Sequence, residues 1–462
     1  MKHIHLIYTL LFGLAVFLFF GLAYPHHLHY QEQYQLFLFD GNYVWEIVRL
    51  PGGVADLLGR FCTQFFLFAW VGAAIIAVLL MAVQLLTLRL FSLCIPSHSR
   101  GGAEVGWLYG LSFVPSFLLW LFLLDENALL GGVWAVLLTL LSAWGLVRLP
   151  GGWTRRIAIL VAIPILYWIA FGGNHYHRYP TVTPYLLYAA WLSAVVLPFL
   201  VGICHKWKPS ITYSTLSFIL VALVMGSLVW KNANFKAEKT MGYDFMARHQ
   251  QWNRILETVN AEKPNNQIGV TVQNLALAMH GMLADHLFEY NQNGLLGLLP
   301  DVQSDATSPM PTAEAFYQLG MVYVAQRTVF EAQEAILDFQ KSGRCYKRLA
   351  QTNLIIGSYE VARKYLAALQ KTLFYRSWAN ETLPLLGNEK AIAQHPEYGR
   401  LRQMVYDKDF YFSDHVTPEM LESLYYGNPD NRLALEYLKA YYMLTGDRDG
   451  YAKLLRQTPA NQ

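Results

Sequence analysis

The first half of the sequence is a succession of long apolar segments, and this feature most restricts what the chain can fold into. Segments of this length can cross the hydrocarbon core of a membrane as helices. The first could be a signal peptide, but the sequence behind it offers a poor cleavage site and more apolar segments follow, so we expect a retained anchor. About seven spans are predicted, at residues 4–23, 65–91, 106–124, 128–147, 157–173, 185–204 and 212–230.

The character of the chain changes after Trp230. From Lys231 to Gln462 the residues Glu, Lys, Arg, Gln and Asn are frequent, whereas charged residues make up only 15% of the whole chain of 462 residues. Soluble domains contain about one quarter charged residues. We therefore predict an all-α protein with two domains, a polytopic transmembrane helix bundle at 1–230 and an extracytoplasmic helical domain at 231–462.

Net charge and cysteine positions exclude two further classes. The formal net charge of +3 is close to neutral and gives no electrostatic footprint for nucleic acid, which usually needs a clustered basic face, so no nucleic-acid partner is expected. Of the four cysteines only Cys345 lies in the polar half, which therefore has no internal disulfide.

The orientation in the membrane follows from Lys and Arg, which resist translocation. With Met1 in the cytoplasm, the short outer loops contain only Arg49, Arg60 and Arg178. The N-terminus is therefore expected in the cytoplasm and the C-terminal domain outside. The cytoplasmic side then collects Lys2, Arg89, Arg100, Arg148, Arg155, Arg156, Lys206 and Lys208.

The first outer loop, residues 24–64, begins with YPHHLHYQEQYQLFLFD. The spacing of Tyr34, Phe37 and Leu38 predicts a helix lying in the membrane interface. The turn at 40–42 separates it from a second short helix, and the prolyl-glycine stretch at 50–53 ends that one. We expect a folded cap over the outer mouth of the bundle, on the same side as the turn at 125–127 and the loop NHYHRYP at 174–180.

Two carboxylates of this cap, Glu32 and Asp40, are candidate catalytic groups. A carboxylate at the mouth of an apolar bundle is partly desolvated, which raises its pKa toward the range of a general base. The alternative is that each caps a helix or pairs with Arg49, Arg60 or Arg178.

Histidines are the second unusual feature of the outer loops. On a helix, His26, His29 and Glu32 would share one face, a donor set that suits zinc or another transition metal. No recognised ligand spacing such as HExxH is present, so no metal ligand is assigned, and a divalent metal stays an open alternative. Interfacial histidines also hydrogen-bond to headgroups and backbone.

Arg178 is the only Arg or Lys of its outer loop and could hold a phosphate or carboxylate in a bidentate contact. The alternative is a structural pair with Glu32, Asp40 or Glu46. The candidate substrate-binding residues are His29, Gln33, Arg49, His175, His177 and Arg178.

The polar half contains a pattern typical of tetratricopeptide-like helix pairs. Small residues and aromatics at these offsets allow close helix packing and fill the grooves between pairs. Such solenoids hold peptides or partner proteins, although they also serve as lids or spacers. The first copy places Phe316, Leu319, Gly320, Tyr323 and Ala332 at the expected offsets, and the second places Tyr346, Leu349, Ala350, Asn353, Gly357 and Ala362 there. No P-loop, nucleophile elbow or dinucleotide-binding glycine motif is present in the sequence.

The stretches HYQEQYQLFLF, LPGGVADLLGRFCTQFF and NLALAMHGMLADHLF together resemble an uncharacterised family of polytopic bacterial inner-membrane proteins, a domain of unknown function. The resemblance spans nearly the whole chain. It implies location in the inner membrane and no particular activity.

The architecture is more distantly similar to GT-C membrane glycosyltransferases. The similarity implies a polyprenyl-phosphate-linked sugar donor, with Glu32 or Asp40 as base or metal partner and Arg178, His175 and His177 holding the phosphate. The loop lacks the paired acidic motif of many such enzymes, and fold-level analogy alone does not assign function. We expect such a transferase, or alternatively a non-enzymatic envelope assembly protein that docks a protein or glycan partner on its helical-repeat domain.

Overall fold

The computed structural model describes residues 2–94, 107–149, 152–166, 184–203, 211–301, 308–336, 340–406 and 417–458. Throughout these ranges the secondary structure is helical and contains no strand. The all-α prediction is therefore confirmed. The chain divides into two compact units, Met1–Glu238 and Lys239–Gln462, and each is described by itself.

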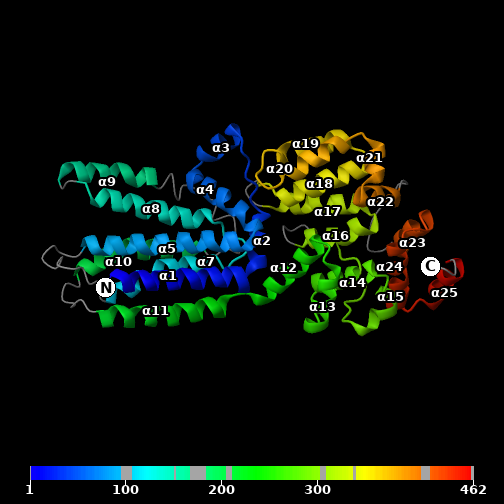
Figure 1. Ribbon diagram of the computed structural model, residues 1–462, viewed down its shortest axis with the longest axis horizontal. Coiled ribbons are helices and arrows are strands. Elements are labelled where there is room, and N and C mark those ends of the chain that lie inside the picture. Colours follow the sequence, from blue (N-terminus) through cyan, green and yellow to red (C-terminus); the bar gives the residue numbers. More distant parts are fainter. Residues whose placement is uncertain are drawn as a thin grey trace. The chain divides into compact units, whose positions relative to one another are not determined.

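The first unit is a bundle of mostly apolar helices, with α5, α10 and α11 as its longest members (Figure 1). Between them lie the short helices of the first outer loop. The elements are α1 (Lys2–Leu18), the π-helix η1 (Phe19–Ala23), α2 (Pro25–Glu32), α3 (Gly41–Val48), α4 (Gly53–Thr63), the 3-10 helix η2 (Gln64–Leu67), α5 (Ala69–Cys94), α6 (Trp107–Leu111), α7 (Val114–Phe122), α8 (Gly131–Val147), α9 (Trp153–Leu166), α10 (Pro184–Ile203), α11 (Ile211–Asn232) and the start of α12 (Phe235–Arg248).

Three helices of the described residues are long and apolar enough to cross a membrane, at Ile4–Ala23, Ala69–Ser92 and Ile211–Asn232. This is fewer than the seven expected. Shorter apolar helical stretches, Leu108–Phe122, Gly131–Leu146 and Tyr185–Ala194, fall within three of the other predicted spans. The predicted span at 157–173 coincides with α9 and then leaves the described residues after Leu166.

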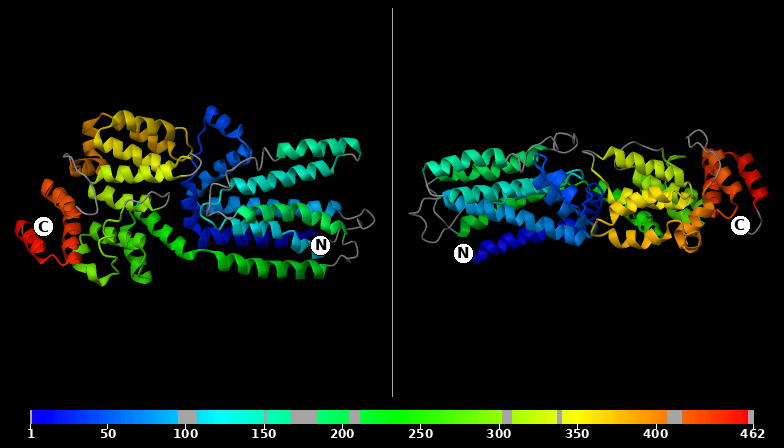
Figure 2. Two further views of the ribbon diagram at one scale, coloured as in Figure 1. Left: turned by 180° about the vertical axis from the view of Figure 1, so that it is seen from behind. Right: turned by 90° about the horizontal axis from the view of Figure 1, so that it is seen from above.

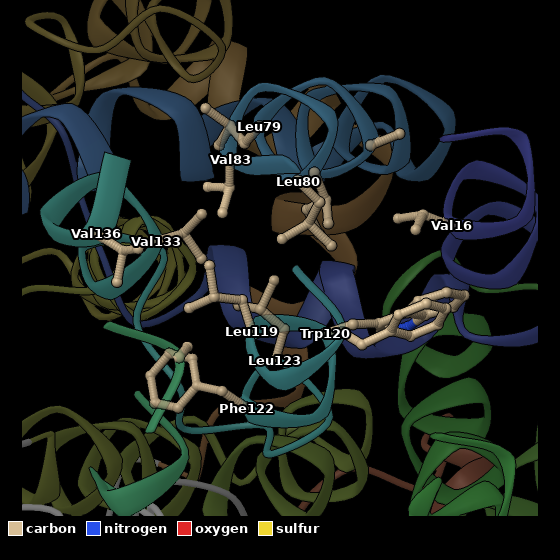
Figure 3. Close-up of a cluster of buried hydrophobic side chains, with 14 of the residues drawn as sticks. Val16, Leu79, Leu80, Val83, Leu119, Trp120, Phe122, Leu123, Val133 and Val136 are labelled. Atoms are coloured by element: carbon tan, nitrogen blue, oxygen red, sulfur yellow. The ribbon is translucent and has the colours of Figure 1, made fainter. Parts of the chain in front are cut away.

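The core of this unit includes branched and aromatic side chains from α1, α5, α7 and α8 (Figure 3). Helices that are apolar on all sides can bury several faces at once. Three polar side chains of this core bond to one another: the Gln84 amide donates to the Ser112 hydroxyl at 2.9 Å, and the Thr9 hydroxyl donates to Gln84 at 3.0 Å. Buried members are Val16 from α1, Leu79, Leu80 and Val83 from α5, Leu119 and Trp120 from α7, and Val133 and Val136 from α8.

Residues 24–64, predicted as the first outer loop, contain three short helices, α2, α3 and α4. The turn at Asp40 does begin a helix, and Gly52, with φ of +75°, redirects the chain into α4 as expected. The predicted helix through Tyr34, Phe37 and Leu38 is wrong, because residues 35–40 are not helical. Tertiary contacts replace it: the Tyr43 hydroxyl donates to the Leu36 carbonyl at 2.8 Å, and Phe37 packs on Tyr43 and Phe61.

The second unit consists of shorter helices, many of which run as adjacent antiparallel pairs (Figure 2). Its elements are the rest of α12, α13 (Trp252–Glu262), α14 (Gln267–Met279), α15 (Leu283–His286), η6 (Leu287–Glu289), α16 (Pro309–Leu319), α17 (Val322–Ala335), α18 (Gly343–Ile356), α19 (Tyr359–Leu369), α20 (Arg376–Thr382), η8 (Leu383–Leu385), α21 (Glu389–Gln394), α22 (Pro396–Met404), α23 (Thr417–Gly427), α24 (Arg432–Thr445) and α25 (Arg448–Gln457).

Two of these pairs form where the repeat pattern predicts them. Gly320 ends α16 with φ of +88° and Gly357 ends α18 with φ of +87°, a left-handed conformation that only glycine adopts without strain. The chain then turns back as α17 and α19, which pack on their partners. Phe316 and Leu319 are fully buried as the pattern requires, whereas Tyr323 is 56% exposed.

Candidate functional site

The polar residues of the first unit gather where α2 begins. Pro25 is the first residue of α2 and Tyr24 before it offers no capping side chain, so the next backbone N–H groups need an acceptor from elsewhere. Glu238 of α12 supplies it: one carboxylate oxygen accepts the His26 N–H at 2.7 Å and the other accepts the His27 N–H at 2.8 Å. A carboxylate at a helix N-terminus also meets the positive end of the helix dipole.

Glu238 is buried in this position. Burial raises the pKa of its carboxyl group to about 7, and the two backbone N–H donors oppose the rise. A group with this pKa changes its charge near neutral pH. Sequence reasoning missed Glu238, and the only available signal was the proline-led helix without a cap of its own.

A second bond ties the same two segments together. The Tyr24 hydroxyl accepts the Asn234 N–H at 2.8 Å, between the end of α11 and the start of α12. The Tyr24 ring packs on Phe19 and on the His27 ring. The chain that leaves α11 is therefore fastened to α2 at two points, which explains why the first unit extends beyond Trp230 to Glu238.

His27 is completely buried beside the Tyr24 and Phe20 rings. Burial lowers its pKa to about 4, and the nearby Leu123 carbonyl opposes the shift. Neither ring nitrogen has a hydrogen bond of normal geometry within the described residues. The imidazole is therefore neutral at pH 7 and acts as a packing group.

The turn at 125–127 joins this cluster through Gln31 of α2. The Gln31 amide donates to the Ala128 carbonyl at 3.1 Å and to the Asp125 carbonyl at 3.4 Å. Burial raises the pKa of Asp125 to about 6, while the Asn127 N–H, which donates to its carboxylate at 2.9 Å, opposes the rise. Two of the three polar outer loops thus meet, and the third, at 174–180, lies outside the described residues.

A crevice opens between α2 and this turn. Its volume of about 10 Å³ has room for about one water molecule. A sugar phosphate does not fit this space. The lining residues are Gln31, Tyr34, Gln35, Thr63 and residues 126–130.

The two predicted catalytic carboxylates occupy different environments. Glu32 lies at the end of α2 and is 5% exposed. Asp40 is the N-cap of α3, where its carboxylate accepts the N–H groups of Asn42 at 3.1 Å and Tyr43 at 3.2 Å. Asp40 therefore has the capping role that the sequence left as the alternative. Catalysis by either group stays a prediction.

The predicted substrate-binding residues lie only partly in the described chain. The His29 ring approaches the His26 ring with 3.4 Å between their Nδ1 atoms, and the Gln33 amide donates to the His29 carbonyl at 3.3 Å. Arg49 caps the C-terminus of α3 and is exposed. His175, His177 and Arg178 lie outside the described residues. Within the described ranges, no group of three or more His, Cys, Asp or Glu could hold a metal ion.

Arg60, which the sequence offered as a partner for Glu32 or Asp40, pairs with Asp56 instead. The two residues are one turn apart on α4, with 2.7 Å between Arg60 Nη2 and the Asp56 carboxylate. Both side chains are largely buried. The i, i+4 spacing was a visible signal for this pair.

A separate polar network lies in the second unit, around α18. The Arg344 guanidinium donates to both carboxylate oxygens of Asp244, at 2.6 and 2.7 Å. Burial by itself raises the pKa of Asp244, but Arg344 outweighs it and the pKa is lowered. Arg348 pairs with Glu314, and the Tyr317 hydroxyl donates to Glu397 at 2.8 Å. These pairs were not predicted, because they join helices distant in sequence.

Comparison with known proteins gives one match. A model of a family of unknown function, DUF6057, matches residues 2–175 and 169–462. No curated protein matches the chain. No solved structure matches it either.

Proposed function

Since the chain belongs to the family of unknown function DUF6057, we propose its function from its geometry: a membrane anchor that displays a helical docking domain. The observation that supports this is the structural use of the polar groups at the outer end of the first unit. Glu238 and Asp40 cap helices there, and the crevice has room for about one water. In this proposal the second unit binds the partner.

The finer topology belongs to this proposal. The shorter apolar helices and α9 complete about seven spans in a bacterial inner membrane, with the N-terminus in the cytoplasm and the second unit outside. Its helix pairs form a tetratricopeptide-like solenoid that holds a protein or glycan partner. The spacing of glycines and aromatics and the two left-handed glycine turns support the repeat assignment.

Crosslinking in intact cells tests the docking function. A photoreactive amino acid at Tyr323, which is exposed on α17, should give a discrete protein adduct. The same amino acid at Leu220, exposed on the apolar helix α11, is the matched control and should give lipid adducts only. No protein adduct at Tyr323 or at other exposed positions of the second unit would overturn the proposal.

A second candidate is a GT-C-like transferase that uses a polyprenyl-phosphate-linked donor. Asp125 and Glu238 favour it, because their pKa values of about 6 and 7 suit general acid–base chemistry at neutral pH. In this proposal Glu32 or Asp40 is the base, with a divalent metal if one is needed. The donor would be held by His29, Gln33, Arg49, His175, His177 and Arg178.

Native mass spectrometry of the protein in mild detergent separates the two candidates. A co-purifying polyprenyl phosphate that is lost in Arg178→Ala would support the transferase. In cells, Glu32→Gln or Asp40→Asn should then abolish an envelope glycan while the protein still inserts. Bulk phospholipid alone, with a normal envelope in both variants, would leave the docking function as the better account.

A further inference from the structure

The helix α18 presents several cations on one side. Arg344, Lys347 and Arg348 follow one another at spacings of three and one, which places them on a single helical face. The side chains of all three are at least partly buried. Helix α22, which packs on α18, adds Arg400. Positive charges held in this way are costly unless an anion compensates them.

Two of these cations are compensated within the chain. Arg344 pairs with Asp244, and Arg348 pairs with Glu314. Burial by itself lowers the pKa of both guanidinium groups, but the carboxylates outweigh it and the pKa is raised in each case. Their charge is therefore stabilised where it lies.

Lys347 and Arg400 are different. Within the described residues neither has a carboxylate oxygen within 4.0 Å, and burial lowers the pKa of both. The Lys347 ammonium lies 5.1 Å from the centre of the Trp378 ring. Arg400 donates to the Gln318 side chain at 2.7 Å and to the Gln318 carbonyl at 3.3 Å, which are neutral acceptors.

One carboxylate lies near both of them. Glu397 raises the pKa of Lys347 and of Arg400, so its charge acts on each. It also accepts the Tyr317 hydroxyl and acts on Arg348. The carboxylates that act most on Lys347 are Glu397 and Glu314, and Glu314 already pairs with Arg348.

One buried hydrogen-bond donor on α18 has no acceptor within the described residues. The Nη1 atom of Arg348 is buried and has no hydrogen-bond partner in the described part of the chain. Buried donors of native proteins are nearly always satisfied, and an unsatisfied one costs about 1–3 kcal/mol. Its guanidinium stacks at 3.7 Å over the Tyr317 ring, which holds it in place.

We propose that Lys347 and Arg400, together with the unsatisfied Nη1 of Arg348, bind an acidic polypeptide segment beside Trp378; these three residues are named here the α18 cation cluster. The inference rests on the proposed docking function and names the chemistry of its partner. Lys347 and Arg400 form no ion pair within the described residues and lie on two different helices, α18 and α22, so successive carboxylates of one chain can pair with them. The indole of Trp378 offers an apolar face next to the charge, as peptide-binding sites commonly do.

Fluorescence anisotropy with the full-length protein in detergent tests this site. The probe is a fluorescein-labelled nonapeptide of alternating Glu and Gly, and the same peptide with Gln in place of Glu is its uncharged control. The acidic peptide should bind at least about tenfold more tightly than the Gln peptide. Equal binding of both peptides, or binding of neither, would overturn the inference.

Variants assign the binding to the cluster. Lys347→Met keeps the length of the side chain and removes its charge, so affinity for the Glu peptide should fall about tenfold. Lys364→Met on the exposed side of α19 is the matched control and should change nothing. A melting temperature in the same detergent verifies that both variants are folded, and Lys347→Arg should restore binding. Unchanged affinity in a folded Lys347→Met protein would overturn the assignment.

Two further outcomes separate this inference from the docking function. Trigalacturonate that binds in a Lys347-dependent manner, when the Glu peptide does not, would replace the acidic polypeptide by an anionic glycan. A protein crosslinked to Tyr323 in cells, together with no binding of the Glu peptide, would leave the docking function intact and overturn the inference. Peptide binding without any crosslinked partner would support the site and count against the docking function.

Discussion

Each end of α12 carries one buried carboxylate, Glu238 or Asp244, and the pKa values of these two groups are shifted in opposite directions. Glu238 is 6% exposed and accepts two backbone N–H groups, whereas Asp244, 8% exposed, accepts a bidentate guanidinium. Burial raises the pKa of both. At Glu238 the effect of burial dominates, and the pKa rises to about 7. At Asp244 the charge of Arg344 outweighs the effect of burial, and the pKa is lowered. At similar burial, a full opposite charge compensates desolvation and two peptide dipoles do not.

The largest effect is expected from breaking the pair at the second end of α12. Asp244→Asn leaves the Arg344 guanidinium buried without its counter-charge, which should cost about 3–5 kcal/mol of unfolding free energy. Thermal unfolding in detergent, or proteolysis of the second unit, measures the loss. Lys239→Gln is the control, because Lys239 is 59% exposed and its pair with Glu262 should contribute less than about 1 kcal/mol. Equal effects of the two substitutions would contradict the comparison.

The next effect concerns pH and the first end of α12. The pKa of Glu238 is raised from 4.5 to about 7, so between these values the folded state binds more protons than the unfolded state. Its contribution is fully present below pH 4.5 and is lost as pH rises to 7, by roughly 3 kcal/mol in total. Melting curves of the His27→Phe protein at pH 5 and 7.5 should show this loss, because the opposing titration of His27 is then absent, and a further Glu238→Gln substitution should remove it.

His27 should act in the opposite direction over nearly the same interval. Its pKa is lowered from 6.5 to about 4, so its contribution is present above pH 6.5 and is lost as pH falls toward 4. In the unaltered protein the two slopes largely cancel. His27→Phe should therefore reveal a protein that becomes more stable on acidification, and Glu238→Gln one that becomes less stable. If the stability of both variants changed with pH in the same direction, the assignment of these two opposite contributions to Glu238 and His27 would be wrong.

The smallest effect is expected at the neutral contact beside Glu238. Tyr24→Phe removes the hydroxyl that accepts the Asn234 N–H and should cost about 1 kcal/mol, without any change in pH dependence. The exposed Tyr323→Phe substitution is the control and should be neutral. A loss in Tyr24→Phe as large as that in Asp244→Asn would mean that dipolar contacts at the first end matter as much as the ion pair at the second.

Local signals predicted the features that depend on neighbouring residues. Asp40 before Gly41 begins α3, Gly52 redirects the chain into α4, and Gly320 and Gly357 end helices that the repeat pattern had located. Such signals act within a few residues, where the preferences of caps and left-handed turns decide. The same reasoning failed at 35–40, because the contacts of Phe37 and Leu36 with Tyr43 and Phe61 replace helical hydrogen bonds.

The candidate site residues show more clearly what could not be predicted from the sequence. Residue types pointed to Glu32, Asp40 and the histidines as candidate site residues. In the structure Asp40 is the N-cap of α3, and His27 is completely buried. The carboxyl groups with raised pKa values include Glu238, which no motif marked, and Asp125, whose turn the sequence had placed on the same side as the first loop. The cap of α2 comes from 212 residues further along the chain, so no spacing could indicate it.

The sequence by itself determined that this is an all-helical protein of an apolar half and a polar half, because hydrophobic periodicity and segment length are local properties. It also determined its family. The tertiary structure alone decided which carboxylate caps α2, which one neutralises Arg344, and which cations of α18 and α22 form no ion pair within the described chain. These outcomes depend on burial and on partners brought together by folding, and neither quantity is a property of a residue or of its neighbours in sequence.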